Sequence, residues 1–362
     1  MAEVYFLDYS KEQNVLQALK DLFTKSSLAE TILGQGSVAV KLHMGELGNI
    51  TYLRPIFVRR VVDLINRAGG KPFVTDATTL YAGGRNTPER YLATAASNGF
   101  VEATIGAPVV IADADGDEGV AVAIENPVAG CQLKDIRVAT RIYHADSLMV
   151  LSHVKGHDQT GFGGAIKNLG MGCVTKKSKR AQHAVNAPVL DESRCDGCGN
   201  CVDVCQQHAL SMVDEKPVRD VELCTNCSEC ISNCPKEALC WPEGSKEKLQ
   251  VCLAHAAWAV LKNFSGRVGF INFVQDVTPH CDCASPAGLP IIQDVGILAS
   301  LDPIAIDKAS LDLIDRAPIV VSPAPASPPD LLGRMHGTDS LVQLRAGERL
   351  GLGSLEYRLI TI

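Results

Sequence analysis

Apolar residues along the chain fall into short runs typical of buried strands, separated by longer stretches with helical periodicity. The helical stretch 55–67 has Pro55 in its first turn and Gly69 just past its end, which frames a helix. The strand-like runs cover residues 3–9, 37–43, 71–75, 148–154 and 267–274. Strands that alternate with helices predict an α/β fold with a mostly parallel sheet and helices on both of its faces.

Further elements follow from capping residues and short apolar runs. Ser10 with Gln13 resembles a capping box and opens a predicted helix to about residue 25. Thr87 and Asp302 are predicted to cap two more helices. Other expected elements are a helix at 245–263, and strands at 109–112, 120–124, 136–140 and 355–362.

Eight of the fourteen cysteines fall in two runs that share the spacing C-x2-C-x2-C-x3-C. Thiolates are soft ligands that suit iron–sulfur clusters, and in two-cluster ferredoxins the fourth cysteine of each run ligates the other cluster. We therefore expect two 4Fe-4S clusters. One would be held by Cys195, Cys198, Cys201 and Cys234, and the other by Cys224, Cys227, Cys230 and Cys205.

The repeat extends beyond the cysteines, because His208-Ala209-Leu210 and Glu237-Ala238-Leu239 follow their runs at the same offset. Such a pattern is typical of a duplicated unit. A zinc ribbon is the alternative, although zinc sites use pairs of cysteines with long spacers. We predict an inserted α+β ferredoxin-like domain at 188–243, between the first (1–187) and second (244–362) parts of the α/β domain. Short linkers at both ends should hold it against one place on that domain.

Composition narrows the class of protein. The chain has 362 residues, is 46% hydrophobic and carries a net charge of −7, which argues against binding to nucleic acid. Neither a signal peptide nor a membrane span is expected. Because exposed thiolates and iron–sulfur clusters need reducing surroundings, we expect a cytoplasmic protein of an anaerobe.

Candidate site residues cluster where predicted strands end. His43 and Asp76 each follow a strand, and His153 and His157 lead out of another into a glycine-rich stretch. Ligands bind at the carboxyl ends of strands in open parallel sheets, so these residues are expected to meet at one edge. For His153 and His157 the alternative is a structural role.

The glycine-rich stretch contains Gly161, Gly163 and Gly164, followed by Lys167. It departs from the dinucleotide fingerprint and from the P-loop. A strand followed by glycines and the start of a helix is nevertheless an arrangement that directs backbone N–H groups at an anion. Lys167 could add positive charge or anchor a cofactor. A tight packing turn is the alternative. We expect the basic run 176–180 to be a solvated face.

His280, Cys281 and Cys283 form a second cysteine motif outside the two runs. In extended backbone Cys281 and Cys283 would point to the same side, and with His280 they could hold a further metal or a redox centre. A buried turn with inert thiols is the alternative. The remaining cysteines, Cys131, Cys173, Cys240 and Cys252, are expected to act as small hydrophobes.

Several of these motifs together resemble the domain-of-unknown-function family 362, which often contains an inserted two-cluster ferredoxin. The resemblance reaches to about residue 316, and its most specific part runs from His153-Val154-Lys155-Gly156-His157 through the glycine-rich stretch to Gly172. Other matching motifs are Val40-Lys41-Leu42-His43, Thr75-Asp76-Ala77, residues 276–283 and Asp302-Pro303-x-Ala305-x-Asp307. The resemblance implies an iron–sulfur protein without specifying its reaction. A fainter similarity, at His153 and Gly163 to Lys167, is to the lactate racemase family, whose loop lysine carries a nickel-pincer nucleotide; here the lysine is displaced by one position.

Three functions are compatible with these patterns. The first is an oxidoreductase that passes electrons through the clusters to a substrate, or to a flavin or deazaflavin, in the α/β cleft, with His153, His157, Lys167, Cys281 and Cys283 as catalytic candidates. The second is an electron carrier or docking subunit. The third is a metal- or nucleotide-dependent isomerase. The expected partners are a redox protein or low-potential electron donor and a small anionic ligand; a homodimer is left open.

Overall fold

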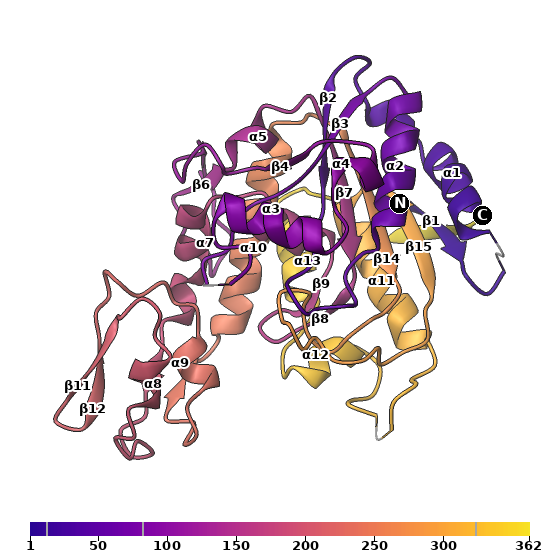
Figure 1. Ribbon diagram of the computed structural model, residues 1–362. Helices are drawn as coiled ribbons and strands as arrows, with labels where there is room; N and C mark the ends of the chain where they lie inside the picture. Colours follow the sequence, from indigo (N-terminus) through magenta and orange to yellow (C-terminus); the bar gives the residue numbers. More distant parts are fainter. Residues whose placement is uncertain (12–13, 82, 323) are drawn as a thin grey trace.

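A single large sheet runs through the molecule (Figure 1). The computed structural model describes residues 1–11, 14–81, 83–322 and 324–362. Within these residues eight strands join in the order β16-β1-β15-β14-β7-β2-β3-β4. Their bounds are β1 (Ala2–Asp8), β2 (Ser37–Lys41), β3 (Lys71–Asp76), β4 (Val109–Ile111), β7 (Ser147–His153), β14 (Val268–Val274), β15 (Gly296–Ser300) and β16 (Tyr357–Thr361).

The sheet is mostly parallel, as predicted. Strands β14, β7, β2, β3 and β4 pair in parallel with one another, and β16 pairs in parallel with β1. Strand β15 is antiparallel to both of its neighbours, β1 and β14. The apolar run at β15 was not among the predicted strands, so the antiparallel part of the sheet is a finding of the structure.

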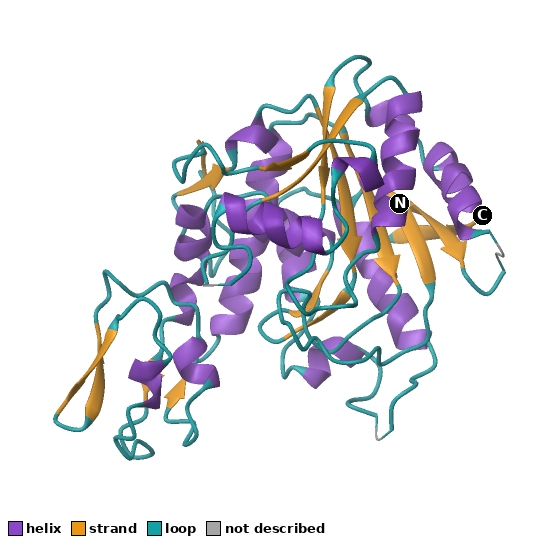
Figure 2. Cartoon of the chain, in the orientation of Figure 1, coloured by secondary structure: helices purple, strands orange, loops and turns teal. Residues whose placement is uncertain are grey.

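Both faces of the sheet are buried, because successive side chains of each strand point to opposite sides. In β7, Leu148 and Val150 belong to one hydrophobic cluster and Met149 and Leu151 to the other. The prediction of helices on both faces is thereby confirmed, and the fold is α/β. Figure 2 shows the helices on either side of the strands.

One face is covered by the helices of the first third of the chain: α1 (Val15–Lys25), α2 (Pro55–Arg67), α3 (Pro88–Ser97) and α4 (Glu102–Ile105). The other face is covered by α5 (Thr140–Tyr143), α6 (Ala165–Gly172), α10 (Ser245–Lys262), α11 (Pro303–Arg316), α12 (Leu331–Met335) and α13 (Val342–Arg349). Helix α7 (Lys176–His183) packs against α10, and the 3-10 turns are η1 (Leu28–Thr31) and η2 (Ala184–Asn186). Among the described residues, none of these helices combines the length and the apolar character that a membrane crossing needs.

Helix α1 begins later than expected. Its N-cap is Asn14, whose side chain accepts a hydrogen bond from the Gln17 N–H, and the first helical residue is Val15. Gln13 of the predicted capping box lies outside the described residues. Helix α2 has the predicted bounds, with Pro55 at its first position.

Two small sheets lie beside the main one. Strands β5 (Val120–Ala123) and β6 (Asp135–Val138) form an antiparallel pair. Strands β8 (Lys155–His157) and β9 (Gly161–Gly163) form another, so the chain makes a hairpin between β7 and α6. His153, at the end of β7, and His157, at the end of β8, therefore do not share a helix face.

Residues 188–243, here called the cysteine segment, form a small unit beside α7 and α10 (Figure 1). Strand β10 (Val189–Leu190) at its start pairs with β13 (Leu239–Cys240) at its end, so the segment leaves the main fold and returns to it at one place. Its other elements are α8 (Asn200–Asp203), β11 (Leu210–Val213), β12 (Lys216–Arg219) and α9 (Glu229–Ser232).

The backbone of the cysteine segment repeats itself. Left-handed φ angles occur at Gly197, Gly199 and His208, and again 29 residues later at Asn226 (φ 56°), Ser228 (φ 69°) and Glu237 (φ 49°). Side chains other than glycine rarely adopt this conformation, so its recurrence at matching positions shows one backbone path built twice. The sequence repeat is therefore also a structural repeat.

Helix α11 depends on its cap, Asp302. The carboxylate accepts hydrogen bonds from the N–H groups of Ile304 and Ala305, and its second oxygen accepts one from Ser354 near the C-terminal strand. We expect Asp302→Ala to lower the free energy of unfolding by about 1–2 kcal/mol. Asp302→Asn should cost less, since an amide oxygen still caps the helix while the contact with Ser354 is lost. Denaturant unfolding followed by circular dichroism would measure both; equal effects of the two variants would contradict the cap as the main contribution.

Candidate functional site

The carboxyl ends of three neighbouring parallel strands, β2, β3 and β7, open into one cavity of about 600 Å³. Strand β2 brings Lys41 and His43 to it, β3 brings Asp76, and β7 brings His153. The predicted convergence of strand ends at one edge of the sheet therefore holds in the structure. A volume of this size is in the range of small-molecule and cofactor sites.

Most of the predicted site residues line this cavity. Its lining includes His43, Asp76, His153, His157, Gly163, Gly164, Lys167, Cys281 and Cys283. Gly161 does not line it: an added Cβ there would lie 2.4 Å from the Ser340 hydroxyl, so its role is close packing. His280 is also outside the lining and forms a hydrogen bond with Asp158 at 2.7 Å.

Asp76 is held by a buried ion pair. The Lys41 ammonium lies 3.0 Å from the Asp76 carboxylate, and both side chains are almost completely buried. Lys41 also donates a hydrogen bond to the Asn168 side chain on α6, and the Tyr91 hydroxyl donates one to Asp76. Asp76 is therefore a partner of the protein's own cation and is not free to bind a ligand cation.

A second buried pair lies on the adjoining wall of the cavity. The Arg85 guanidinium contacts the Glu46 carboxylate at 2.9 Å and donates a hydrogen bond to the Tyr81 hydroxyl. The other Glu46 oxygen accepts hydrogen bonds from the N–H groups of Leu47 and Gly84. This acid, too, is fully used within the protein.

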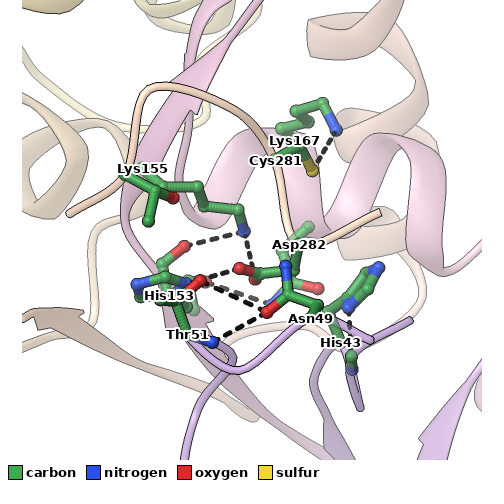
Figure 3. Close-up of polar contacts among 12 residues, drawn as sticks. His43, Asn49, Thr51, His153, Lys155, Lys167, Cys281 and Asp282 are labelled. Atoms are coloured by element: carbon green, nitrogen blue, oxygen red, sulfur yellow. Dashed lines mark hydrogen bonds and ion pairs between the residues drawn. The ribbon is translucent and has the colours of Figure 1, made fainter. Parts of the chain in front are cut away.

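The third pair is centred on Asp282, in the loop after β14 (Figure 3). Its carboxylate lies 2.8 Å from Nδ1 of His153 and 3.1 Å from the Lys155 ammonium. Burial works against the Asp282 charge, but His153 and Lys155 outweigh it and lower its pKa. The other His153 nitrogen faces the Gln275 carbonyl at 2.9 Å, so both ring nitrogens of His153 are engaged in the protein.

Three histidines at the cavity are kept neutral. Burial lowers the pKa of His43 well below its usual range, and Arg85 acts in the same direction. Burial, and to a smaller extent the charge of Lys167, lowers the pKa of His157 well below its usual range. The same two causes lower the pKa of His183 to about 4. Nδ1 of His43 accepts a hydrogen bond from the Gly45 N–H, which leaves the proton on Nε2. That buried Nε2 has no hydrogen-bond partner among the described residues.

The N-terminus of α6 is occupied by a side chain of the protein. Asp307 of α11 accepts hydrogen bonds from the N–H groups of Ala165 (2.7 Å) and Ile166 (3.0 Å). An added Cβ on Gly164 would lie 2.3 Å from this carboxylate, so the glycine makes room for it. These two N–H groups are therefore not free to bind a phosphate, in contrast to the anion cradle expected from the glycines. Burial raises the pKa of Asp307 to about 6.

Cys281 and Cys283 both line the cavity. They belong to a tight turn, closed by the Ala284 N–H to the Cys281 carbonyl, and not to the extended backbone that was expected. A hydrogen bond from the Cys283 thiol lowers the pKa of Cys281 well below its usual range, while burial opposes this and Lys167 favours it. The same hydrogen bond raises the pKa of Cys283. The Lys167 ammonium lies 3.8 Å from the Cys281 sulfur (Figure 3).

The cysteine segment contains two small hollows that divide the eight cysteines into two sets. One hollow is lined by Cys195, Cys198, Cys201 and Cys234. The second is lined by Cys205, Cys224, Cys227 and Cys230. The duplicated N–H groups of Ala209 and Ala238 donate to the sulfurs of Cys205 (3.3 Å) and Cys234 (3.2 Å). The sets are those expected from the crossed ligation pattern, and the residues present fit the predicted clusters.

The second hollow adjoins the large cavity. Cys227, Ser228 and Glu229 line both of them. The Ser228 hydroxyl accepts hydrogen bonds from Trp241 (3.0 Å) and, across the boundary of the segment, from Gln159 (3.5 Å). The first hollow shares no lining residue with the cavity.

A site for a single metal ion is not found within the described residues: no three His, Cys, Asp or Glu side chains are grouped closely enough to bind one. This includes the predicted set of His280, Cys281 and Cys283, since the structure pairs the two thiols but directs His280 to Asp158. A cubane differs from such a site, because it spreads its four thiolates over four iron atoms.

A family described as Domain of unknown function (DUF362) matches residues 38–312, more than half of the chain. The chain belongs to the DUF362 family. The matched region includes the whole cysteine segment and every residue that lines the large cavity. No curated protein matches this DUF362 chain.

Two solved structures are similar to this DUF362 protein. One is the lactate racemase apoprotein from Thermoanaerobacterium thermosaccharolyticum, with a TM-score of 0.36 and 12% identity over 76% of this chain and 51% of the other. Another is a crystal structure of a protein from Thermotoga maritima, with a TM-score of 0.39 and 10% identity over 72% of this chain and 50% of the other. The DUF362 chain thus matches about half the length of each.

Several residues at the cavity were not identified from the sequence. They are Glu46, Tyr81, Arg85, Lys179 and His183. Lys179 belongs to the basic run expected to be a solvated face, yet it is buried and donates a hydrogen bond to the Thr78 carbonyl. Within the run 176–180, the prediction of an exposed side chain is confirmed for Lys177 only. Helical spacing offered a clue, since Lys179, Gln182 and His183 lie on one side of α7.

The neutral state of His183 predicts a pH-dependent stability. Its pKa is about 4 in the folded protein and 6.5 in the unfolded chain, so the unfolded chain binds more protons between these values. The free energy of unfolding that neutral His183 contributes is therefore fully present above the pKa of the unfolded chain. It is lost as the pH falls toward the pKa of the folded protein. We expect the free energy of unfolding to drop by about 2 kcal/mol from this residue between about pH 7 and about pH 5.

His183→Asn should remove this part of the pH dependence while keeping an acceptor for the Asn186 amide, which contacts His183 at 3.2 Å. His144→Asn is the matched control, because His144 is exposed. The measurement is denaturant unfolding over this pH range. Parallel curves for the wild type and His183→Asn would show that burial of His183 does not contribute.

Proposed function

We propose that this DUF362 protein is an iron–sulfur oxidoreductase that delivers electrons to an anionic compound bound in the large cavity. The cysteine segment would be a ferredoxin-like domain with two 4Fe-4S clusters, held by the two cysteine sets that line its hollows. When bound, such clusters supply single electrons at low potential. A redox partner protein would supply these electrons in turn.

The observation that supports this proposal most is the position of Cys227. This residue lines both the second cysteine hollow and the cavity, so its thiolate would stand between a cluster and a bound ligand. The contact of Ser228 with Gln159 holds this part of the segment against the cavity wall. A segment serving only as a carrier would not require a cavity at this position.

An anionic ligand follows from the charges at the cavity. The acids Asp76, Glu46 and Asp282 are already paired with cations of the protein. Lys167 and Nε2–H of His43 are donors at the cavity that remain available to a ligand. Donors and positive charge bind carboxylates and phosphates. The cavity is also large enough for a flavin or deazaflavin next to a small substrate.

The role of Cys227 can be tested against its counterpart in the first run, Cys198. Both single Ser variants should lose about four of about eight iron atoms per chain. Only Cys227→Ser should also stop electron transfer from dithionite to an acceptor in the cavity, because Cys198 lines the hollow remote from it. Iron analysis, electron paramagnetic resonance and stopped-flow reoxidation of the anaerobically purified protein would show this.

Equal loss of electron transfer in both variants would mean that electrons do not leave the clusters at Cys227. Wild-type protein without iron would remove the proposal altogether. Nickel with a nucleotide in the purified protein would favour the isomerase alternative, and iron with an empty cavity would favour the electron carrier.

The anionic character of the ligand can be tested at Lys167. We expect Lys167→Ala to raise the Kd for malonate about tenfold, since one charge-assisted contact is lost. Lys177→Ala is the control, because Lys177 is exposed and pairs with Glu118 at 3.1 Å. Isothermal titration calorimetry would measure both. Unchanged binding by Lys167→Ala would assign Lys167 a packing role or a role toward Cys281 alone.

A further inference from the structure

Cys281 and Cys283 lie in one tight turn, separated only by Asp282. A β-turn brings its first and third residues closer together than extended backbone does, and a disulfide requires Cα atoms about 4.4–6.8 Å apart. The Ala284 N–H closes this turn at 2.9 Å from the Cys281 carbonyl. An interaction between the two thiol side chains shifts the pKa of Cys281 down and that of Cys283 up, so the sulfurs lie close to each other. The turn therefore brings the two sulfurs together at one place in the cavity lining.

The surroundings make the two sulfurs unequal. Cys281 faces the Lys167 ammonium at 3.8 Å, and Asp282 between the two cysteines is fixed by Lys155 and His153. An adjacent cation and a hydrogen bond stabilise a thiolate, which is the nucleophilic form of cysteine. Cys283 keeps its proton. The pair is thus arranged as one attacking and one resolving sulfur, and both line the cavity.

We infer that Cys281 and Cys283 form a dithiol–disulfide couple that reduces a small anionic disulfide in the cavity. This inference rests on the proposed function, because that function supplies the electrons that restore the dithiol. It assigns a two-electron centre to the protein itself, at the place where a flavin or deazaflavin would otherwise be needed.

The chemistry balances in three steps. The Cys281 thiolate attacks one sulfur of the substrate disulfide, whose S–S bond breaks, and the first substrate thiolate leaves. Cys283 then attacks the Cys281 sulfur and passes its proton to the second substrate thiolate, which leaves as a thiol while the Cys281–Cys283 disulfide forms. This disulfide takes up two electrons and one proton, and the Cys281 thiolate and Cys283 thiol are restored. Two one-electron centres match the two electrons that the couple requires.

The negative charge of the substrate is inferred from the Lys167 ammonium. Its small size is inferred from the cavity volume of about 600 Å³. A matched pair of probes separates charge from reactivity. Dithiodiglycolate carries two carboxylates and cystamine two ammonium groups, and the two are similar in length. We expect Cys281 to react with dithiodiglycolate about tenfold faster than with cystamine.

The test uses the full-length, anaerobically purified protein with its clusters oxidised. After addition of dithiodiglycolate, free thiols are alkylated and the peptides are analysed by mass spectrometry. Wild-type protein should lose both alkylation sites in the peptide that contains residues 281 and 283. Cys283→Ser should trap one thioglycolate on Cys281, and Cys281→Ser should trap none on Cys283.

Cys240→Ser is the control for unspecific oxidation, because Cys240 is an exposed thiol outside both cysteine sets. Its loss should leave the reaction at Cys281 unchanged. The inference is overturned if Cys283→Ser forms no adduct, if both probes react at the same rate, or if Cys240 is the thiol that reacts while Cys281 stays free. Cluster absorbance and thermal unfolding of each variant show that the protein remains folded.

A second measurement distinguishes this inference from the proposed function. The clusters of the protein in its Cys281–Cys283 disulfide form are reduced with dithionite. Alkylation of free thiols then shows whether the disulfide bond has reopened. If the bond reopens only with added dithiothreitol, electron delivery into the cavity fails while the dithiol couple remains. If the clusters reduce another bound acceptor and the two cysteines stay inert throughout, the couple fails while the proposed function remains.

Discussion

The site depends on one fully buried carboxylate, Asp282. An isolated charge in such a place would cost several kcal/mol, so it persists only with compensating partners. His153 at the end of β7 and Lys155 at the start of β8 provide them. Because Asp282 belongs to the loop after β14, this contact ties the ends of two neighbouring parallel strands together. It thereby fixes the cysteine turn above the edge of the sheet, where a ligand can reach both sulfurs.

Local patterns predicted the elements, whereas long-range pairing determined the site. Helix α2 and strands β2, β3 and β7 follow from periodicity and capping residues, because these signals lie within each element. The occupation of the α6 N-terminus by Asp307 could not be read in this way, since the two are about 140 residues apart. Lysine within a strand, as at Lys41, was an available sign, because burial of a lone ammonium is expensive and implies a partner. Its partner, Asp76, was predicted as a site residue, but not as the other half of an ion pair.

The duplicated cysteine segment becomes asymmetric only through its packing. Cys198 and Cys227 hold equivalent places in the two runs, and the backbone angles around them repeat. Ser228, however, contacts Gln159 and Trp241, whereas its counterpart Gly199 has no side chain to do so. The second run is thereby placed beside the cavity and the first away from it. Nothing in the cysteine spacing distinguishes the two runs, so this difference in role required the tertiary structure.

The protonation states at the cavity bear on the proposed reduction. His43 accepts a hydrogen bond at Nδ1 and keeps its proton on Nε2, and the Gln159 N–H engages His157 in the same way at 3.2 Å. Both rings are therefore donors toward a ligand, and His153 has no free nitrogen. Reduction consumes electrons together with protons, which donors of this kind can supply. The neutral histidines at the cavity are thus compatible with the supply of protons that the proposed reduction needs.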